Sequence, residues 1–255
     1  RNLGVSQAQG DLLLFLDSDV IVDPHCITHH LRSQQQYQNR PVLGRMKPWQ
    51  TSWRPWYEKM IEPESAGRDY GDQPKDLPFF FAYSCNLSIA RTIFEQIGGF
   101  DESFPASGFE DTEFAYRMEM LGYRLLYQPQ CLGYHNHPMT IKQRCKKEVS
   151  YAASLALLIS KYPYLSAVIP GVDELMPIWL PPRSMQRVWH RSRARFLGLR
   201  PVRSALYRSL VWLDERQSLP RLAGILFWRL LVGCRCVGFQ EGLQRYSPVV
   251  SGVVS

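Results

Sequence analysis

The stretch LLLFLDSDV, residues 12–20, decides how the fold of this 255-residue chain begins. Its five uninterrupted apolar residues predict a buried strand, and two aspartates follow where the apolar run stops. In an open α/β sheet, ligands collect beyond the carboxyl ends of the strands. Asp17 and Asp19 therefore form either an ordinary acidic turn or a pair of oxygen ligands for Mg²⁺ or Mn²⁺.

Strand-like and helix-like segments alternate from this strand to about residue 140. Residues 24–37 have the pattern of an amphipathic helix, on which His29 and His30 have no evident partner. A second helix is expected from 109 to 121, and two short strands are expected between residues 123 and 135. This alternation predicts an α/β domain.

Two further clusters carry groups that are able to do chemistry. Glu110 and Asp111 open the second helix, where acids either complement the helix dipole or present a carboxylate that accepts a proton. His135 and His137 lie in the segment YHNHP, residues 134–138, as structural loop residues or as metal ligands that join the aspartates. Local sequence leaves both choices open.

Charge and apolar content distinguish the C-terminal third. Eight arginines and no acidic residue lie between Arg183 and Arg208, within a chain of net charge +7. This segment either contacts anionic lipid or forms a solvated basic face, and nucleic acid is disfavoured because no nucleic-acid-binding motif accompanies it. The apolar segment 219–239 is interrupted by Arg229, so we expect no membrane-spanning run of ~20 residues. Six scattered cysteines without a CxxC pair indicate reduced thiols in a cytoplasmic protein.

Taken together, four segments resemble family 2 glycosyltransferases with the GT-A fold. They are RNLGVSQAQGDLLLFLDSDV (1–20), CNLSIARTIFEQIGGFDESF (85–104), GFEDTEFAYRMEMLGYRLLYQP (108–129) and YHNHP (134–138). The resemblance covers about residues 1–140, and its order and spacing are specific. It implies a Rossmann-like mixed α/β sheet, with a partial GT-A catalytic domain over 1–141 and a helical, basic region over 142–255.

The resemblance also implies roles for individual residues. Asp19 would coordinate the metal on the diphosphate, Asp17 would approach the ribose and uracil side, and His135 would be the additional ligand, with His137 as the fallback. Asp111 would be the general base and Glu110 would position the acceptor or the base. The remaining cofactor-binding residues would be Arg1 and Asn2 on the nucleotide side, and Asn86, near Tyr83 and Ser84, where donor sugar and acceptor meet.

The implied reaction is a direct displacement with inversion at the anomeric carbon. The donor would be a nucleotide-diphosphate sugar, chiefly a UDP-sugar, the cofactor Mn²⁺ or Mg²⁺, and the acceptor a glycan or glycolipid hydroxyl. The expected location is the cytoplasm, with peripheral attachment at the inner face of the membrane. The aromatic segment from Trp49 to Tyr57 is expected to form either a sugar-stacking wall or a packed lid.

The sequence also departs from the family pattern, because the strands that hold the nucleotide base would precede Arg1. We therefore expect the chain to be truncated at its N-terminus and to bind nucleotide sugar poorly by itself, while the complete gene product is active. Two other classes stay open: a nucleotidyltransferase on a related sheet, and a non-catalytic, membrane-associated sugar-binding protein.

Overall fold

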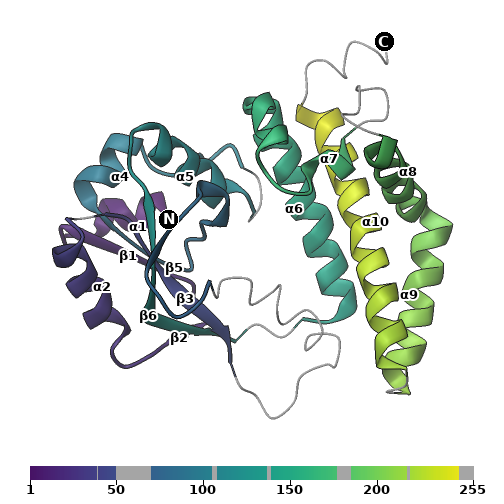
Figure 1. The fold of residues 1–255 in the computed structure, drawn as a ribbon, viewed down its shortest axis with the longest axis horizontal. Coiled ribbons are helices and arrows are strands. Elements are labelled where there is room, and N and C mark those ends of the chain that lie inside the picture. Colours follow the sequence, from purple (N-terminus) through teal and green to yellow (C-terminus); the bar gives the residue numbers. More distant parts are fainter. Residues whose placement is uncertain are drawn as a thin grey trace. The chain divides into compact units, whose positions relative to one another are not determined.

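The computed structural model describes residues 1–38, 40–49, 70–104, 108–136, 139–176, 185–216 and 219–246. The chain divides into two compact units: a sheet unit (1–102 and 110–138) and a helical unit (103–109 and 139–255). The predicted class, an α/β domain followed by a helical region, is confirmed (Figure 1). Whereas the sequence predicts one boundary after residue 141, the structure also assigns the short segment 103–109 to the helical unit.

The sheet unit is built on a mixed, six-stranded sheet. Its strand order is β1-β5-β3-β6-β2, and β4 pairs with the beginning of β6. The β3–β6 pairing is parallel and the other pairings are antiparallel. The strands are β1 Leu12–Leu16, β2 Val20–Val22, β3 Val42–Pro48, β4 Lys75–Leu77, β5 Asn86–Ala90 and β6 Leu125–His135.

Among the described residues of this unit, four helices and one 3₁₀ turn accompany the sheet. They are α1 Asn2–Gln7, α2 Cys26–Gln36, η1 Phe79–Phe81, α4 Arg91–Ile97 and α5 Glu110–Met120. Phe114 and Met118, four residues apart on α5, are each 1% exposed, because this spacing places both side chains on one face of the helix. The expected helical face ends there, since Leu121 lies past the end of α5 and is exposed.

The two short strands expected between residues 123 and 135 are one continuous strand, β6. Its register against β3 shifts between Gly44 and Arg45, which is why a single strand resembles two in sequence. At this irregularity a Cβ atom on Gly44 would overlap the Asn86 side chain and the Cys131 carbonyl oxygen. Glycine at this position therefore allows β3 to approach β5 and β6 closely.

The helical unit contains six helical segments among its described residues. They are α6 Ile141–Lys161, η2 Pro163–Ala167, α7 Val172–Leu175, α8 Met185–Gly198, α9 Arg200–Glu215 and α10 Pro220–Tyr246. The first of them, α6, starts at a capping box made by Thr140 and Gln143. The last, α10, packs along α6, α8 and α9. Its Gly238 meets the Val149 backbone of α6 so closely that a Cβ atom would overlap it.

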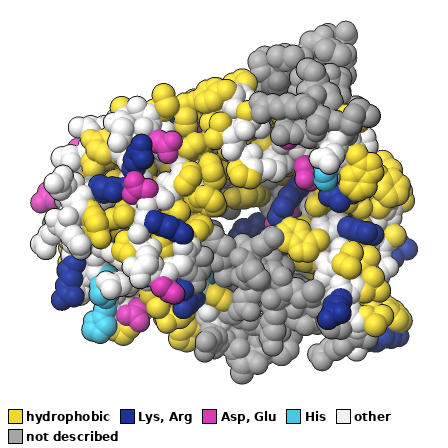
Figure 2. Space-filling view, viewed as in Figure 1, with side chains coloured by type: hydrophobic (Ala, Val, Ile, Leu, Met, Phe, Trp, Pro, Cys, Tyr) yellow, Lys and Arg dark blue, Asp and Glu magenta, His cyan; other side chains and the backbone are white. Residues whose placement is uncertain are grey.

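The apolar segment around Arg229 differs from its prediction. It forms one uninterrupted helix, and residues Arg221–Tyr246 are long and apolar enough to cross a membrane by length and composition alone. Much of this stretch is buried inside the unit, including Phe227, Leu231 and Phe239. Figure 2 shows hydrophobic side chains among Lys and Arg over the part of the surface where α8 and α9 lie.

The segment before α5 packs on α6 within the helical unit. Lys161 Nζ donates to Ser103 Oγ at 2.7 Å and lies 5.5 Å from the ring centroid of Phe104. The rings of Phe109 and Tyr151 are 4.4 Å apart. These contacts fasten both described ends of the segment to α6.

Candidate functional site

The acidic turn after β1 is brought to the end of β6 by strand pairing. The Val20 N–H donates to the Asp17 carbonyl oxygen at 3.1 Å, which closes the turn between β1 and β2. In the β2–β6 register Val20 is opposite His135, and the Asn136 N–H donates to the Asp19 carbonyl oxygen at 2.8 Å. Residues separated by more than 110 positions in sequence are therefore adjacent.

Asp17, Asp19 and His135 form a three-residue cluster with the chemistry of a divalent metal site. One ligand atom from each lies within 4.8 Å of the others, and His135 Nε2 is 3.3 Å from Asp19 Oδ1. Two carboxylates and an imidazole suit Mn²⁺ or Mg²⁺ with further oxygen ligands. The fallback ligand, His137, lies outside the described residues.

An aromatic side chain borders this cluster. The backbone N–H of Trp49 donates to the His135 carbonyl oxygen at 2.9 Å, and the centroid of the Trp49 ring lies 5.6 Å from that of Tyr134. Trp49 is 36% exposed, which leaves part of the indole open to a ligand. The rest of the expected aromatic segment, from residue 50 to Tyr57, lies outside the described residues.

Asp111, at the start of α5, is held by the segment that leads into β5. Its Oδ2 accepts from the Ser84 N–H at 3.0 Å, and its Oδ1 is buried with no hydrogen-bond partner among the described residues, although 21% of the side chain is exposed. Burial raises the pKa of Asp111 to about 6, the Glu110 carboxylate adds to this rise, and Arg1 and the Ser84 amide oppose it. A carboxylate with this pKa is suited to accept a proton near neutral pH.

Arg1 joins the two acidic clusters. Its Nη1 donates to Glu110 Oε1 at 2.7 Å and lies 3.7 Å from Asp111 Oδ1. Its guanidinium carbon lies 5.2 Å from the ring centroid of Phe100, and it is close enough to Asp17 for their charges to interact. The arginine expected on the nucleotide side is thus engaged with the acidic pair of α5.

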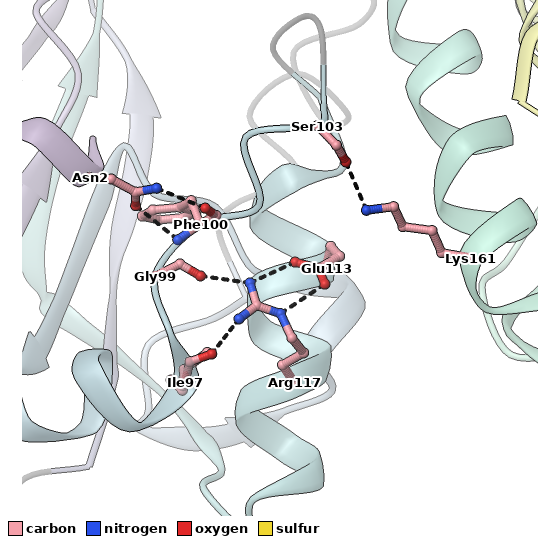
Figure 3. Close-up of polar contacts among 8 residues, drawn as sticks. All are labelled: Asn2, Ile97, Gly99, Phe100, Ser103, Glu113, Arg117 and Lys161. Atoms are coloured by element: carbon pink, nitrogen blue, oxygen red, sulfur yellow. Dashed lines mark hydrogen bonds and ion pairs between the residues drawn. The ribbon is translucent and has the colours of Figure 1, made fainter.

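Asn2, expected to bind nucleotide, instead holds the Gly98-Gly-Phe-Asp-Glu102 turn (Figure 3). Its Nδ2 donates to the Phe100 carbonyl oxygen at 2.8 Å and to Glu102 Oε1 at 2.9 Å, and its Oδ1 accepts from the Phe100 N–H at 2.9 Å. Both amide protons and the amide oxygen are therefore used inside the protein. We therefore propose that Asn2 supports this turn, and its expected contact with nucleotide stays an untested prediction.

An ion pair within α5, between Glu113 and Arg117, supports the same turn and was not among the residues predicted from the sequence. Arg117 Nε and Nη2 donate to the two carboxylate oxygens of Glu113, both at 2.8 Å. The guanidinium also donates to the carbonyl oxygens of Ile97 and Gly99 (Figure 3). The signal was available in sequence, because an acid and an arginine four residues apart share a helix face.

We expect Asn2→Ala to lower the free energy of unfolding by about 1–3 kcal/mol, because it leaves the Phe100 N–H without its acceptor. Chemical denaturation measures this loss, with Ser6→Ala, an exposed polar residue of the same helix, as the control. The dissociation constant for nucleotide is expected to stay unchanged. A weaker nucleotide affinity at unchanged stability would restore the original assignment.

Asn86 is fully buried and belongs to a polar network beneath the acidic turn. Its Oδ1 lies 2.9 Å from His30 Nε2, and its Nδ2 donates to the Cys131 carbonyl oxygen at 2.8 Å. His30 Nδ1 lies 2.8 Å from Ser88 Oγ, which accepts from Gln34 Nε2 at 3.0 Å. A direct contact between Asn86 and a donor sugar would break these bonds, so we propose that Asn86 positions the start of β5, and its expected contact with the donor stays an untested prediction.

His30 therefore has the partners that its sequence context did not reveal. Cys26, His30, Ser33 and Gln34 are the buried residues of α2, so the inward face of this helix is largely polar. Burial lowers the pKa of His30 to about 4. Because the unfolded chain then binds a proton more readily than the folded one, stability falls as the pH drops below about 6.5 and stops falling near pH 4.

We expect His30 to remove about 2 kcal/mol of stability between pH 7 and pH 5, from the shift of its pKa. Denaturation of the natural protein and of His30→Gln at both pH values isolates this term, since other titrating groups cancel in the difference. The exposed His25, replaced by glutamine, is the matched control. Equal pH dependence in the natural protein and in His30→Gln would contradict the linkage.

Two families match the chain, and curated relatives match parts of it. Residues 1–98 match the family described as glycosyl transferase family 2, and residues 75–140 match the one described as N-terminal domain of galactosyltransferase. Validoxylamine A glucosyltransferase of Streptomyces hygroscopicus subsp. jinggangensis is 27% identical over 48% of this chain and 35% of its own length. The glycosyltransferase YfnE of Bacillus subtilis is 22% identical over 64% of this chain and 52% of its own length.

Further similarities are shorter or more distant. Hyaluronan synthase of Pasteurella multocida is 30% identical over 39% of this chain and 10% of its own length. The solved structure of GalNAc-T7 with UDP, GalNAc and Mn²⁺ is 16% identical, with a TM-score of 0.45, over 75% of this chain and 39% of that chain. The chain thus spans about a third to a half of the length of the two curated glycosyltransferases named first.

Proposed function

We propose that the chain, whose residues 1–98 match glycosyl transferase family 2, transfers a sugar from a nucleotide-diphosphate donor to a hydroxyl of a glycan or lipid-linked acceptor. One observation carries the proposal. The cluster of Asp17, Asp19 and His135 and the raised-pKa carboxyl of Asp111 both lie where β1 ends and β5 begins. A metal-ligand set and a base are the two components that a direct displacement requires.

Asp111 is the general base of the proposed reaction. As a carboxylate it accepts the proton of the acceptor hydroxyl while the oxygen attacks the anomeric carbon of the donor. The bond from that carbon to the diphosphate oxygen breaks in the same step, so the configuration inverts. The Ser84 N–H fixes one oxygen of Asp111, and within the described part of the chain the other oxygen accepts no hydrogen bond that would compete with the substrate.

The leaving group departs on the side of the acidic turn. Asp19, Asp17 and His135 would hold Mn²⁺ or Mg²⁺, which supplies positive charge to the departing diphosphate when bound. Arg1, which interacts with Glu110 and with the charge of Asp17, balances part of the negative charge of the two clusters. Trp49 offers an exposed ring next to His135 on which a sugar or base can stack.

A donor screen on the natural protein that contains this sequence tests the function. The protein is incubated with a panel of UDP-sugars, with Mn²⁺ or Mg²⁺, and with oligosaccharide or lipid-linked acceptors. We expect metal-dependent release of UDP with at least one donor, and NMR of the product should show the anomeric configuration inverted relative to the donor. Turnover with retained configuration would refute the proposed mechanism, and absence of turnover with every donor would refute the function.

A further inference from the structure

The exposed face of α8 alternates aromatic and basic side chains. Trp189, Arg193 and Phe196 follow one another at spacings of four and three, which places them along one side of α8, and the exposed Arg200 begins α9. Trp189 and Phe196 are each 60% exposed. The Arg193 guanidinium carbon lies 5.1 Å from the ring centroid of Trp189, so charge and ring form one joint surface.

Exposed apolar side chains near exposed arginines recur on the two following helices. On α9, the guanidinium carbon of Arg216 lies 4.3 Å from the ring centroid of Trp212, and Arg208 precedes this tryptophan by one helical turn. On the first turns of α10, Leu222 and Ile225 are exposed and lie two turns and one turn, respectively, before the exposed Arg229. We call the exposed residues of these three stripes the aromatic–basic face.

The charge of the aromatic–basic face is mostly positive, although Arg193 Nη2 lies 4.0 Å from Oε2 of Glu174 on α7. Among the described residues of 185–229, the exposed acidic residue is Glu215. Six arginines are exposed in the same range: Arg193, Arg200, Arg208, Arg216, Arg221 and Arg229. Large apolar side chains that are exposed between such charges are unfavourable in water. They suit a partner that offers both an apolar region and negative charge.

We propose that the aromatic–basic face binds the surface of an anionic phospholipid bilayer. Tryptophan and phenylalanine rings lie at the level of lipid headgroups, and arginines of neighbouring turns reach the phosphates. The exposed Leu222 and Ile225 have no counterpart on a nucleic-acid backbone but fit among acyl chains. A second copy of the chain, docked through the same face, would place arginines opposite arginines.

The proposal concerns binding at the surface and not insertion of α10. The buried side of α10 packs inside the helical unit, where Phe227, Leu231 and Phe239 are at most 1% exposed. Exchanging these contacts for lipid would require the unit to open, whereas the exposed stripe is accessible as it stands. Binding to lipid does not depend on sugar transfer. If the proposed function fails its test, the lipid-binding proposal can still be tested separately.

Vesicle co-sedimentation of the full chain provides the test. One set of vesicles contains phosphatidylcholine only, and the other contains phosphatidylcholine with phosphatidylglycerol. We expect the chain to sediment with the phosphatidylglycerol vesicles at low salt and to be released at high salt, because surface attraction is screened within a Debye length. Equal binding to both vesicle types, or none to either, would overturn the proposal.

Two sets of substitutions locate the contact. Replacement of Arg193, Arg208 and Arg216 by glutamine is expected to lower the partition coefficient about 100-fold, at about fivefold for each basic residue. Replacement of Trp189, Phe196 and Trp212 by alanine is expected to weaken binding at least tenfold at every salt concentration, since this contribution is not ionic. Thermal unfolding of both variants checks that the helical unit is intact.

The matched control removes the same charge elsewhere. Arg32, Lys75 and Arg124 are exposed residues of the sheet unit, and their joint replacement by glutamine should lower binding less than threefold. An equal loss in the control would show nonspecific attraction and refute the assignment of the face. If the bound chain resisted both high salt and alkaline extraction, the result would refute surface binding and indicate that α10 inserts into the bilayer. Binding to duplex DNA but not to vesicles would refute the lipid assignment.

Discussion

Replacement of Asp111 by asparagine is expected to lower kcat by about 10²- to 10⁴-fold, the range that a positioned general base contributes. Asparagine preserves the size of the side chain but accepts no proton from the acceptor hydroxyl. The KM for the donor should change little, because the proposed metal site is formed by other residues. Steady-state kinetics on the natural protein and the variant measure both constants.

The pH profile distinguishes a base from a structural aspartate. Because Asp111 has a raised pKa of about 6, its carboxyl is protonated and inactive below that pH, so kcat/KM should rise with pH through this region. Glu110→Gln removes a neighbouring negative charge and should move this rise to lower pH. In Asp111→Asn the rise should disappear, whereas in Asp11→Asn, a change at an exposed aspartate before β1, it should remain. Wild-type turnover in Asp111→Asn would remove the base assignment.

Loss of Asp19 is expected to weaken Mn²⁺ binding by more than about 100-fold, because residues that only orient a metal ligand already contribute about 10- to 100-fold. Isothermal titration of the natural protein and of Asp19→Asn with Mn²⁺ gives the ratio directly, without any sugar donor. His135→Ala removes the third member of the cluster and is expected to weaken binding as well.

The control for the metal site is a nearby aspartate outside the cluster. Asp23 accepts a hydrogen bond from the His25 N–H at 3.0 Å, and Asp23→Asn should bind Mn²⁺ as the natural protein does. If Asp19→Asn kept its Mn²⁺ affinity while Asp23→Asn lost it, the cation would lie elsewhere on this edge of the sheet.

The residues that follow the end of a strand could be predicted from the sequence. The last residue of the apolar run coincides with the end of β1, and the acids that follow it were expected at the ligand-binding edge of the sheet. The cluster of Asp17 and Asp19 with His135 was one of two alternatives that the residues left open, and the resemblance to family 2 glycosyltransferases favoured it. The structure supplies its physical reason, because Val20 pairs with His135 across β2 and β6.

Residues whose polar atoms are used inside the protein were harder to interpret. Asn2 and Asn86 have the residue type and the position of ligand-binding amides, and only the three-dimensional contacts show that their amide groups bond to Phe100 and to His30 and Cys131. His30 was overlooked for the converse reason, since a polar buried face of a helix has no apolar periodicity. Long-range hydrogen bonds of this kind leave no local pattern in the chain.

The placement of residues 103–109 has a topological consequence. The backbone passes from one unit to the other after residues 102, 109 and 138, so three covalent connections join the units instead of one. Cleavage at a single connection leaves the units tethered, and a chain shortened to residue 138 retains Ser103 and Phe109 without Lys161 and Tyr151. The peptide that leads directly into Glu110 and Asp111 would lose its anchor in such a fragment. The start of α5, which carries the proposed base, therefore depends on residues from both units for its approach.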